Sequence, residues 1–482
     1  MENQATLELW PFLLGLINLI AAGWAAGHAL LTKSDVRAAV AWLGVILLLP
    51  VFGWAIYLVF GINRIARRAT ELRGDHQTGD LELPDEEHAL SAIAALPGGK
   101  RLEGMARIGR RVTDIPLTLG NRVGILRNGD EAYPAMIAAI DKAETSVALS
   151  TYIFNNDDAG RLFLEALKRA RARGVKVRVL IDGVGSWYSF PSMIRKLREA
   201  DIPHARFLHS FLPWQMPYLN LRNHQKILVV DGHTGFTGSM NIAAGNLVSR
   251  EPRHPIRDYH FAVDGPVVAH LMAAFAHEWR FSTGELLVGP AWMPDLDNRG
   301  DAVARGLPAG PDMSRNTIRW TLLAALSEAE AHVRIVTPYF LPDSDLTTAL
   351  SLAAMRGVKV DIVLPEKNNL FYMTWASRAQ LDGLIAAGCK VFMSTGPFDH
   401  AKMMTVDGLW SLIGSANWDP RSLRLNFEFN LECFSGDLAG SLDSIIDEKM
   451  HTATPVTLKA LRERPVSTKL QDNLARLMSP YL

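Results

Sequence analysis

Cysteine is scarce in this chain, because Cys389 and Cys433 are the two cysteines among 482 residues. Two cysteines allow one disulfide at most, and their separation excludes the Cys-x-x-Cys spacing of zinc and redox motifs. An excess of one charge is also lacking, since Lys plus Arg and Asp plus Glu each number 50. The composition therefore excludes a disulfide-stapled scaffold and indicates neither a metal site nor a nucleic-acid partner.

Charge is absent altogether from two long segments near the N-terminus, residues 9–31 and 38–61. At about 1.5 Å per helical residue, each segment is long enough to cross a hydrocarbon core of about 30 Å. A signal peptide followed by a buried helix is the alternative, but the first segment lacks a basic leading region and is too long. We therefore predict a membrane-embedded transmembrane hairpin within residues 1–68, with both ends of the chain on one side.

Basic residues predict the orientation of this hairpin, because they concentrate on the cytoplasmic side of membrane spans. The connecting loop contains Lys33 and Arg37. Four arginines follow the second segment: Arg64, Arg67, Arg68 and Arg73. The larger number favours a multi-pass protein whose main body is cytoplasmic.

Residues 69–118 are predicted to be a polar linker followed by a basic segment. Residues 100–112 contain five basic residues against the single acidic Glu103. A second basic group lies near the C-terminus: Lys459, Arg462, Arg464, Lys469 and Arg476. Two interpretations stay open for both groups, namely solvated helix faces or docking on anionic headgroups, where each basic side chain gains about 1 kcal/mol.

The remaining chain contains an internal duplication. Helix 135–143 and strand 147–154 have counterparts in helix 322–331 and strand 333–340, and Arg-Gly-Val-Lys-Val occurs at 173–177 and 356–360. The repeated glycine is typical of a helix end that leads into a buried strand. Alternating helices and strands predict an α/β fold with two pseudo-symmetric domains, residues 119–300 and 301–482, each with a mainly parallel sheet.

One pattern of polar residues occurs in both copies with identical spacing. It comprises His224, Lys226, Asp231, Gly238-Ser239 and Asn241 in the first copy, and His400, Lys402, Asp407, Gly414-Ser415 and Asn417 in the second. In a strand-like segment, His and Lys at alternate positions lie on one face, and a Gly-Ser turn lets the Asn return toward them. A single His-x-Lys would be ordinary structure, but the doubled pattern predicts two half-sites facing each other.

These residue types fit displacement at a phosphodiester, which needs an in-line nucleophile, an acid for the leaving oxygen and cationic donors around phosphorus. His224 and His400 are predicted to supply the nucleophile and the acid. The phosphate-binding set is predicted to be Lys226, Lys402, Asn241 and Asn417. The two lysines supply the positive charge, so neither a metal ion nor another cofactor is expected.

Two carboxylates are predicted to hold the histidines in the tautomer that the reaction needs. Asp258 lies 34 residues after His224, and Glu428 lies 28 residues after His400. Both begin strand-like segments, so ordinary edge-strand carboxylates are the alternative interpretation.

The two HxKxxxxD and GSxN motifs resemble those of the phospholipase D superfamily, and the apolar segment 42–54 is similar to the N-terminal region of bacterial membrane-anchored cardiolipin synthases. The resemblance implies an enzyme of the bacterial inner membrane that transfers a phosphatidyl group between two phosphatidylglycerol molecules, giving cardiolipin and glycerol. It implies a phosphatidyl-histidine intermediate on His224, with His400 as acid and then base. Asp231 and Asp407, counted with the catalytic motif, would shape it rather than touch phosphorus. Anionic phospholipids are the expected partners, and a homo-oligomer stays open.

Four aromatic residues before the motifs are candidates for acyl-chain contact, with ordinary core or lid packing as the alternative: Trp187, Trp214, Phe371 and Trp375. Three other functions compete with phosphatidyl transfer. A hydrolytic phospholipase D that releases phosphatidic acid would use the same residues, whereas cleavage of nucleic acid fits poorly with a membrane hairpin and a neutral body. A non-enzymatic membrane scaffold would not need two intact motifs.

Overall fold

The structure is a computed structural model that describes residues 2–33, 35–61, 86–208, 221–311 and 316–479. It divides into two compact units, Met1–Glu71 and Leu72–Leu482. Each unit is described by itself below, and the second unit contains both copies of the polar motif.

The first unit contains one helix of membrane-spanning length among its described residues. Helix α1 (Glu2–Thr32) is apolar over Phe12–Thr32, a stretch of 21 residues. Its large apolar side chains are exposed, including Leu19 (70%) and Ile20 (63%). A helix that is apolar on its outer surface is stable in lipid rather than in water, which fits a membrane anchor.

The second uncharged segment is broken into short pieces, unlike the single span predicted for residues 38–61. Helix α2 (Val36–Leu48) has 13 residues and is followed by α3 (Gly53–Ile56) and the π-helical turn η1 (Tyr57–Gly61). Thirteen residues extend about 20 Å, which is less than a hydrocarbon core. Pro50, which lacks an N–H group, lies in the break between α2 and α3 and cannot continue a helix.

Residues 36–61 start at the C-terminal end of α1, run back along this helix and then return to its C-terminal end. The turn contacts the middle of α1, because the backbone N–H of Val51 donates to Oδ1 of Asn18 at 3.0 Å. The segment ends beside the C-terminal end of α1, where Nζ of Lys33 donates to the carbonyl oxygen of Gly61 at 2.5 Å. The described residues thus contain one helix of spanning length and a short returning hairpin, where the sequence predicted two spans.

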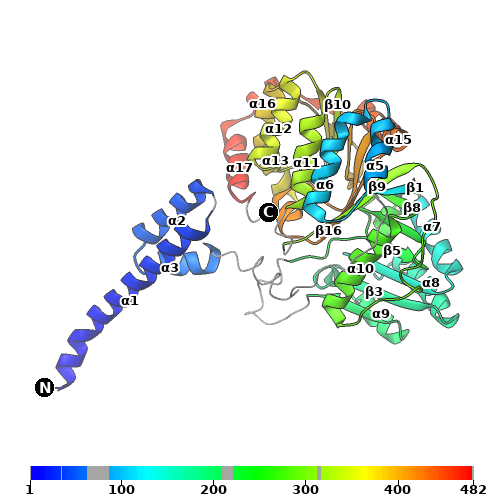
Figure 1. Cartoon of the computed structure of the whole chain (residues 1–482). Coiled ribbons are helices and arrows are strands. Elements are labelled where there is room, and N and C mark those ends of the chain that lie inside the picture. Colours follow the sequence, from blue (N-terminus) through cyan, green and yellow to red (C-terminus); the bar gives the residue numbers. More distant parts are fainter. Residues whose placement is uncertain (1, 34, 62–85, 209–220, 312–315, 480–482) are drawn as a thin grey trace. The chain divides into compact units, whose positions relative to one another are not determined.

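The second unit is built on one sheet of 15 strands among its described residues, in the order β17-β12-β11-β10-β14-β15-β16-β9-β1-β8-β6-β5-β2-β3-β4. Figure 1 labels strands of both copies, such as β3 and β10. The strands of the first copy are β1 (Thr118–Arg127), β2 (Ser146–Thr151), β3 (Lys176–Asp182), β4 (His204–Phe207), β5 (Ile227–Val230), β6 (Thr234–Gly238) and β8 (Tyr259–Asp264). Those of the second are β9 (Ala302–Ala309), β10 (His332–Val336), β11 (Lys359–Pro365), β12 (Lys390–Ser394), β14 (Met403–Val406), β15 (Trp410–Gly414), β16 (Glu428–Phe434) and β17 (Thr454–Val456). A separate pair joins β7 (Ile256–Arg257) to β13 (Phe398–Asp399).

The two copies have corresponding strand orders, which meet at the antiparallel pair of β1 and β9. The prediction of mainly parallel sheets is wrong, because the sheet is mixed. Parallel pairing links β2, β3 and β4, and likewise β10, β11 and β12. The motif strands are antiparallel to their neighbours, since three-residue connections join β5 to β6 and β14 to β15. A connection this short can only reverse the chain, whereas parallel neighbours need a long crossover.

Helices cover the sheet of both copies. The first copy has α7 (Asn128–Lys142), α8 (Asp158–Ala172), α9 (Met193–Glu199) and α10 (Val268–Thr283). The second has α11 (Thr317–Glu328), α12 (Ser344–Met355), α13 (Phe371–Ala386), α14 (Pro420–Arg424), α15 (Gly436–Thr452), α16 (Leu458–Arg462) and α17 (Val466–Leu477). One buried core contains α7 and α8, and a second contains α11 and α12, so each copy has its own core under a shared sheet.

Part of the segment predicted as a linker belongs to the second core. Helix α5 (Glu86–Ala95), the 3-10 turn η2 (Gly99–Leu102) and helix α6 (Glu103–Thr113) contribute the buried Ile93, Leu102 and Met105 to it. Basic residues of this segment pair with acids of the body, as Arg101 does with Asp407 at 2.7 Å. These contacts favour the structural interpretation of that basic group over docking on a membrane.

Candidate active site

The backbone of each motif histidine is hydrogen-bonded to the opposite copy of the fold. His224 precedes β5, and its backbone N–H donates to the carbonyl oxygen of Phe427 in the second copy at 2.8 Å. His400 precedes β14, and its N–H donates to the carbonyl oxygen of Arg257 in the first copy at 2.8 Å. Backbone hydrogen bonds therefore hold each histidine against the strand that leads to the other copy's carboxylate.

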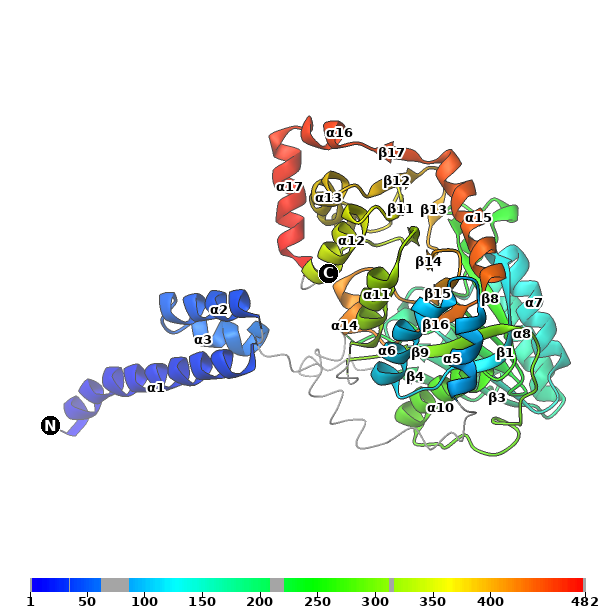
Figure 2. The same cartoon turned by 45° about the horizontal axis from the view of Figure 1, so that its top comes forward.

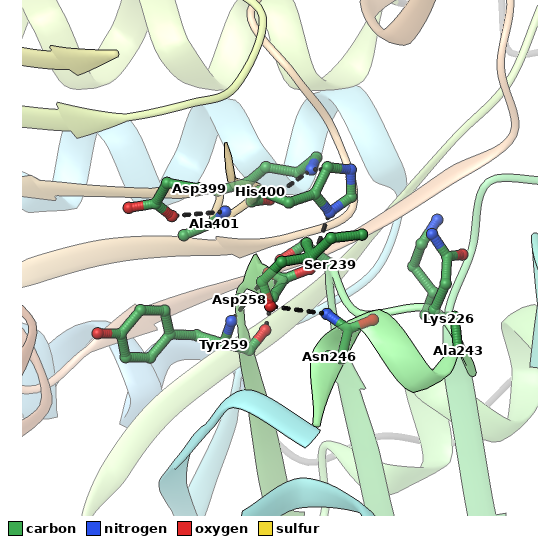
Figure 3. Close-up of polar contacts among 12 residues, drawn as sticks. Lys226, Ser239, Ala243, Asn246, Asp258, Tyr259, Asp399, His400 and Ala401 are labelled. Carbon is green, nitrogen blue, oxygen red and sulfur yellow. Dashed lines mark hydrogen bonds and ion pairs between the residues drawn. The ribbon is translucent and has the colours of Figure 1, made fainter. Parts of the chain in front are cut away.

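Each imidazole is oriented by the carboxylate of the opposite copy. Nδ1 of His224 lies 2.9 Å from Oε2 of Glu428, and Nδ1 of His400 lies 2.8 Å from Oδ2 of Asp258. Figure 3 shows the ring of His400 turned toward Asp258. An ionised carboxylate only accepts hydrogen bonds, so Nδ1 carries the proton and Nε2 keeps its lone pair. Both carboxylates predicted as orienting residues thus reach a histidine, but not the one they follow in the sequence.

The motif serines hold these carboxylates, a role that the sequence did not reveal. Oγ of Ser415 donates to Oε2 of Glu428 at 2.5 Å, and Oγ of Ser239 donates to Oδ1 of Asp258. The serine in each GSxN motif therefore fixes the carboxylate of its own copy, which in turn orients the other copy's histidine. The serine and the carboxylate are 19 residues apart in one copy and 13 in the other. Because the two spacings differ, the sequence did not indicate that these residues form a pair.

The motif glycines permit the close approach of these strands. Gly414 has φ 152°, and a Cβ there would lie 2.4 Å from Oδ1 of Asn430. Gly238 has φ 148°, and a Cβ there would lie 2.8 Å from Nδ1 of His260. A side chain at either position would push the serine away from its carboxylate.

Burial and neighbouring charges keep the carboxylates ionised. Burial alone would raise the pKa of Asp258, but His400, Lys402 and the Ser239 hydroxyl lower it to about 2. Burial also opposes ionisation of Glu428, and His224 outweighs it so that the pKa of Glu428 stays below its usual value. Permanent negative charges therefore stand behind both imidazoles.

Burial favours the neutral forms of the two imidazoles. Burial lowers the pKa of His224 to about 4, with Glu428 opposing the shift. Burial and the charge of Lys402 lower the pKa of His400. The side chain of His224 is nevertheless 12% exposed, so a substrate can reach it. A neutral, oriented and accessible imidazole is a competent nucleophile.

The two lysines lie beside the histidines and differ in their contacts. Nζ of Lys226 donates to the carbonyl oxygen of His224 at 2.6 Å. Nζ of Lys402 donates to the carbonyl oxygen of His400 at 2.8 Å and also lies 3.1 Å from Nε2 of the same ring. Burial lowers the pKa of Lys226 to about 7 and that of Lys402 to about 8. An anion bound between them would favour their charged forms.

The motif asparagines occupy the same region but are not equivalent. Oδ1 of Asn241 accepts from the backbone N–H of Ile153 at 3.2 Å. Nδ2 of Asn417 donates to Oγ of Ser422 at 3.1 Å, and its Oδ1 has no partner among the described residues. Their role as phosphate donors stays a prediction.

Asp231 and Asp407 lie at the far end of the motif strands from the histidines. Both adopt positive φ of 52° in the turn that follows the strand. Asp231 accepts from the backbone N–H groups of residues 144, 145 and 146, and Asp407 from those of residues 330, 331 and 332. These bonds tie each motif strand to the start of β2 or β10, which is a structural task rather than a catalytic one.

Aromatic side chains lie beside His224, and the four aromatic candidates from the sequence differ in their surroundings. Tyr152 packs edge-on against His224 at 5.2 Å between ring centroids and contacts Tyr188 at 6.1 Å. Trp187 is 49% exposed and Phe371 is 61% exposed. The remaining candidates differ in what is described: Trp375 packs on Phe371 at 4.7 Å, whereas Trp214 lies outside the described residues. Within those residues, no group of three or more His, Cys, Asp or Glu side chains could hold a metal ion.

Comparison with known proteins gives two family matches. The family described as cardiolipin synthase, PLD-like domain, matches residues 136–279 and 322–450. The family described as phospholipase D-nuclease N-terminal matches residues 20–61.

Curated relatives extend over nearly the whole chain. A cardiolipin synthase of Geobacillus kaustophilus is 32% identical over 445 residues, covering 92% of this chain and 88% of the relative. Cardiolipin synthase A of Pseudomonas syringae pv. syringae is 34% identical over 477 residues, covering 98% of both. Among solved structures, a phosphatidylserine synthase of Haemophilus influenzae Rd KW20 superposes with a TM-score of 0.63 at 13% identity, covering 78% of this chain and 100% of that chain. That likeness shows the fold alone.

Proposed function

Because this chain belongs to the family of PLD-like cardiolipin synthases, we propose that it joins two phosphatidylglycerol molecules into cardiolipin and releases glycerol. The observation that carries the proposal is the crossed pairing of His224 with Glu428 and of His400 with Asp258. It orients two imidazoles toward one phosphodiester, between two lysines that neutralise its charge.

In the first step, Nε2 of His224 attacks the phosphorus of one phosphatidylglycerol. The P–N bond forms as the P–O bond to glycerol breaks, and His400 gives a proton to the leaving oxygen. The bound anion favours the protonated form of His400 and so opposes the burial that lowers the pKa of this histidine. Lys226, Lys402 and the two motif asparagines stabilise the charge on the other phosphorus oxygens.

In the second step, a hydroxyl of another phosphatidylglycerol attacks the same phosphorus. His400 accepts the hydroxyl proton, the P–O bond of cardiolipin forms, and the P–N bond to His224 breaks. The two steps exchange one phosphodiester for another, so the reaction needs no nucleotide.

An asymmetry between the histidines supports His224 as the nucleophile. Nε2 of His400 lies 3.1 Å from Nζ of Lys402, where it can exchange a proton. Among the described residues, no hydrogen bond occupies Nε2 of His224. Replacement of His224 by Ala should abolish labelling of the protein by radioactive phosphatidyl groups, whereas replacement of His400 should slow turnover and leave labelling. Labelling that persists without His224 and disappears without His400 would reverse these roles.

The acceptor distinguishes this proposal from hydrolysis. The exposed Trp187 and Phe371 support a lipid-facing site in which acyl chains displace water. Incubation with pure phosphatidylglycerol and separation of the lipid products tests the proposal. Cardiolipin together with glycerol is the expected result, and phosphatidic acid alone would overturn it in favour of a phospholipase D.

The family and the first unit also support a proposal for the location. We place the protein in the bacterial inner membrane with α1 as its one span, and the returning hairpin of residues 36–61 in one leaflet. Lys33 and Arg37 then lie at the C-terminal end of α1, and Gly61 is hydrogen-bonded to Lys33 at that same end. In the sequence, four arginines follow within twelve residues of Gly61: Arg64, Arg67, Arg68 and Arg73. This concentration of positive charge supports a cytoplasmic body more strongly than a two-span hairpin would.

A further inference from the structure

The two halves of the site contain the same motif residues, but the charged residues next to the two motifs differ. Arg222 lies two residues before His224, and the corresponding residue before His400 is Phe398. Arg421 lies four residues after Asn417, and the corresponding residue after Asn241 is Gly245. Two guanidinium groups therefore break the internal symmetry of an otherwise duplicated site.

The carbonyl oxygens of both arginines accept hydrogen bonds from the same two-residue segment, residues 426–427, beside His224. The N–H of Phe427 donates to the carbonyl oxygen of Arg222 at 2.8 Å, and the N–H of Asn426 donates to that of Arg421 at 2.9 Å. The carbonyl oxygen of Phe427 in turn accepts from the N–H of His224 at 2.8 Å. Both arginine residues are half-buried. The asymmetric charges are thus concentrated on the His224 side of the site.

The two cations act on each other and on the site. Burial and then the charge of Arg222 lower the pKa of Arg421, and Tyr152, which packs against His224, lies in the field of both. Arg222 and Arg421 also act on the buried Asp182 and Asp419, respectively, and burial raises the pKa of each carboxyl to about 6 against this opposing effect. Their oxygens accept from backbone N–H groups, as Asp182 does from Asn223 at 2.8 Å and Asp419 from Ser422 at 2.7 Å. Two partly desolvated like charges repel each other, and an anion placed between them is stabilised by both.

We propose that Arg222 and Arg421 bind the phosphodiester of the second, acceptor lipid while the first phosphodiester lies between the histidines. The inference rests on the proposed function and deepens it. Cardiolipin contains two phosphodiesters joined by one glycerol, so the acceptor's own phosphate must lie one glycerol away from the phosphorus under attack. Arginine binds phosphate oxygens in bidentate fashion, and water has no anion to bind there. The pair therefore favours a lipid acceptor over water.

Two assays on the full-length protein in phosphatidylglycerol bilayers separate this role from donor chemistry. One measures the ratio of cardiolipin to phosphatidic acid, and the other measures exchange of radioactive glycerol into phosphatidylglycerol, which needs no acceptor phosphate. Arg222→Gln and Arg421→Gln should each lower cardiolipin formation about tenfold or more, shift products toward phosphatidic acid, and leave glycerol exchange within about threefold. Arg424→Gln is the matched control, since Arg424 lies on the same α14 and is 56% exposed.

Each outcome is decisive once the lysine variants are included. Unchanged cardiolipin formation would mean that the arginines bind no acceptor, whereas an equal loss of both activities would leave the decision to the lysine variants. If exchange is lost in the Gln variants, Arg222→Lys and Arg421→Lys should restore exchange fully and cardiolipin formation only in part. Parallel recovery of both would overturn the inference. Wild-type protein that forms no cardiolipin would instead refute the proposed function.

A second, independent observation concerns α17, which turns its apolar side chains away from the protein. Val466, Leu470, Leu474 and Leu477 follow one another at helical spacing and are 71%, 67%, 67% and 72% exposed. The opposite side contains the buried Asp472, which pairs with Arg464. Figures 1 and 2 both place α17 alongside α13. A helix that only completed a protein core would bury its leucines and expose its polar side.

We infer that the outer face of α17 lies in the interface of an anionic bilayer. Lys469 and Arg476 border the leucine stripe, as expected for a helix that meets anionic headgroups. Helix α13, on which α17 packs, begins with the exposed Phe371. The same chain carries α1, so a membrane is already its environment. Contact through α17 would hold the approach to the site against the lipid.

Single-cysteine labelling of full-length protein in nanodiscs tests this contact, because Cys389 and Cys433 are both buried. A fluorophore on Leu474→Cys should be quenched by brominated phosphatidylglycerol. The matched control is Leu162→Cys on α8, where Leu162 is 42% exposed, and it should not be quenched. Equal and weak quenching at both sites would overturn the inference. So would energy transfer between labels on Leu474→Cys without quenching, which would show that a second copy of the chain covers the stripe.

Discussion

Nδ1 of His224 lies 2.9 Å from Oε2 of Glu428, a carboxylate that belongs to the opposite copy of the duplicated fold. The reciprocal contact joins His400 to Asp258 at 2.8 Å. Neither copy therefore contains a complete set of nucleophile and orienting group. The site requires both copies, because each copy supplies the carboxylate that orients the histidine of the other copy.

The crossed pairing predicts which chemical step each carboxylate supports. Glu428→Gln should impair His224, so formation of the labelled phosphatidyl-protein should fall by about 100-fold or more, by analogy with loss of a triad carboxylate. Asp258→Asn should impair His400, slowing turnover while the labelled intermediate still forms. Rapid-quench labelling with radioactive phosphatidylglycerol measures both. If Asp258→Asn abolishes labelling and Glu428→Gln does not, each carboxylate serves the histidine of its own copy.

The histidines and the carboxylates that the sequence predicted as site residues do lie together in the structure, and they could be named because phosphodiester chemistry calls for these residue types; their roles stay predictions. The sequence could not predict the crossed pairing, since that depends on how the two copies meet, at β1 with β9 and at β7 with β13. It also missed the mixed sheet, because hydrophobic patterns report burial and not strand direction. For the break in the second uncharged segment the sequence did contain a signal, namely Pro50, which lacks an N–H group and cannot continue a helix. A count of uncharged residues does not detect this signal.

The pKa shifts predict a bell-shaped pH profile for kcat/KM, which reports the free enzyme. His224 must be neutral to attack, so activity should fall as pH drops toward its pKa of about 4. The lysines must be protonated to bind phosphate, so activity should also fall as pH rises through the pKa values of Lys226 and Lys402, about 7 and about 8. The alkaline limb of kcat should lie at higher pH, because bound phosphate favours the charged lysines. An alkaline limb of kcat/KM that stays flat up to about pH 10, the ordinary lysine range, would contradict the lowered values.

Removal of a buried ion pair outside the candidate active site should lower the stability of the fold. Nε of Arg305 lies 2.5 Å from Oε1 of Glu432, and both side chains are 0% exposed. Glu432→Gln would remove the nearer of the two described counter-charges of Arg305, the other being Glu86 at 3.6 Å, so the free energy of unfolding should fall by about 3 kcal/mol. Denaturant unfolding measures this loss. The control Asp264→Asn removes the surface pair with Arg122, which spans 2.8 Å, and should cost less than about 1 kcal/mol. Equal losses in the two variants would show that Arg305 is satisfied by its other contacts.

The returning hairpin predicts a membrane topology that differs from that of two spans. If α1 is the one span, the loop before α2 lies on the same side of the membrane as the body, and the start of α1 lies on the other side. Cysteines introduced at Asp35, at Gln4 and at the body residue Leu162 can be labelled with a membrane-impermeant maleimide in oriented vesicles, because both native cysteines are buried. Asp35→Cys and Leu162→Cys should react from one side, and Gln4→Cys from the other. With two spans, Gln4→Cys would instead share the side of Leu162→Cys, and Asp35→Cys would react from the opposite face. The difference arises from Pro50, so Pro50→Leu, which restores the N–H, is the variant most able to lengthen α2 and move Asp35 across the membrane.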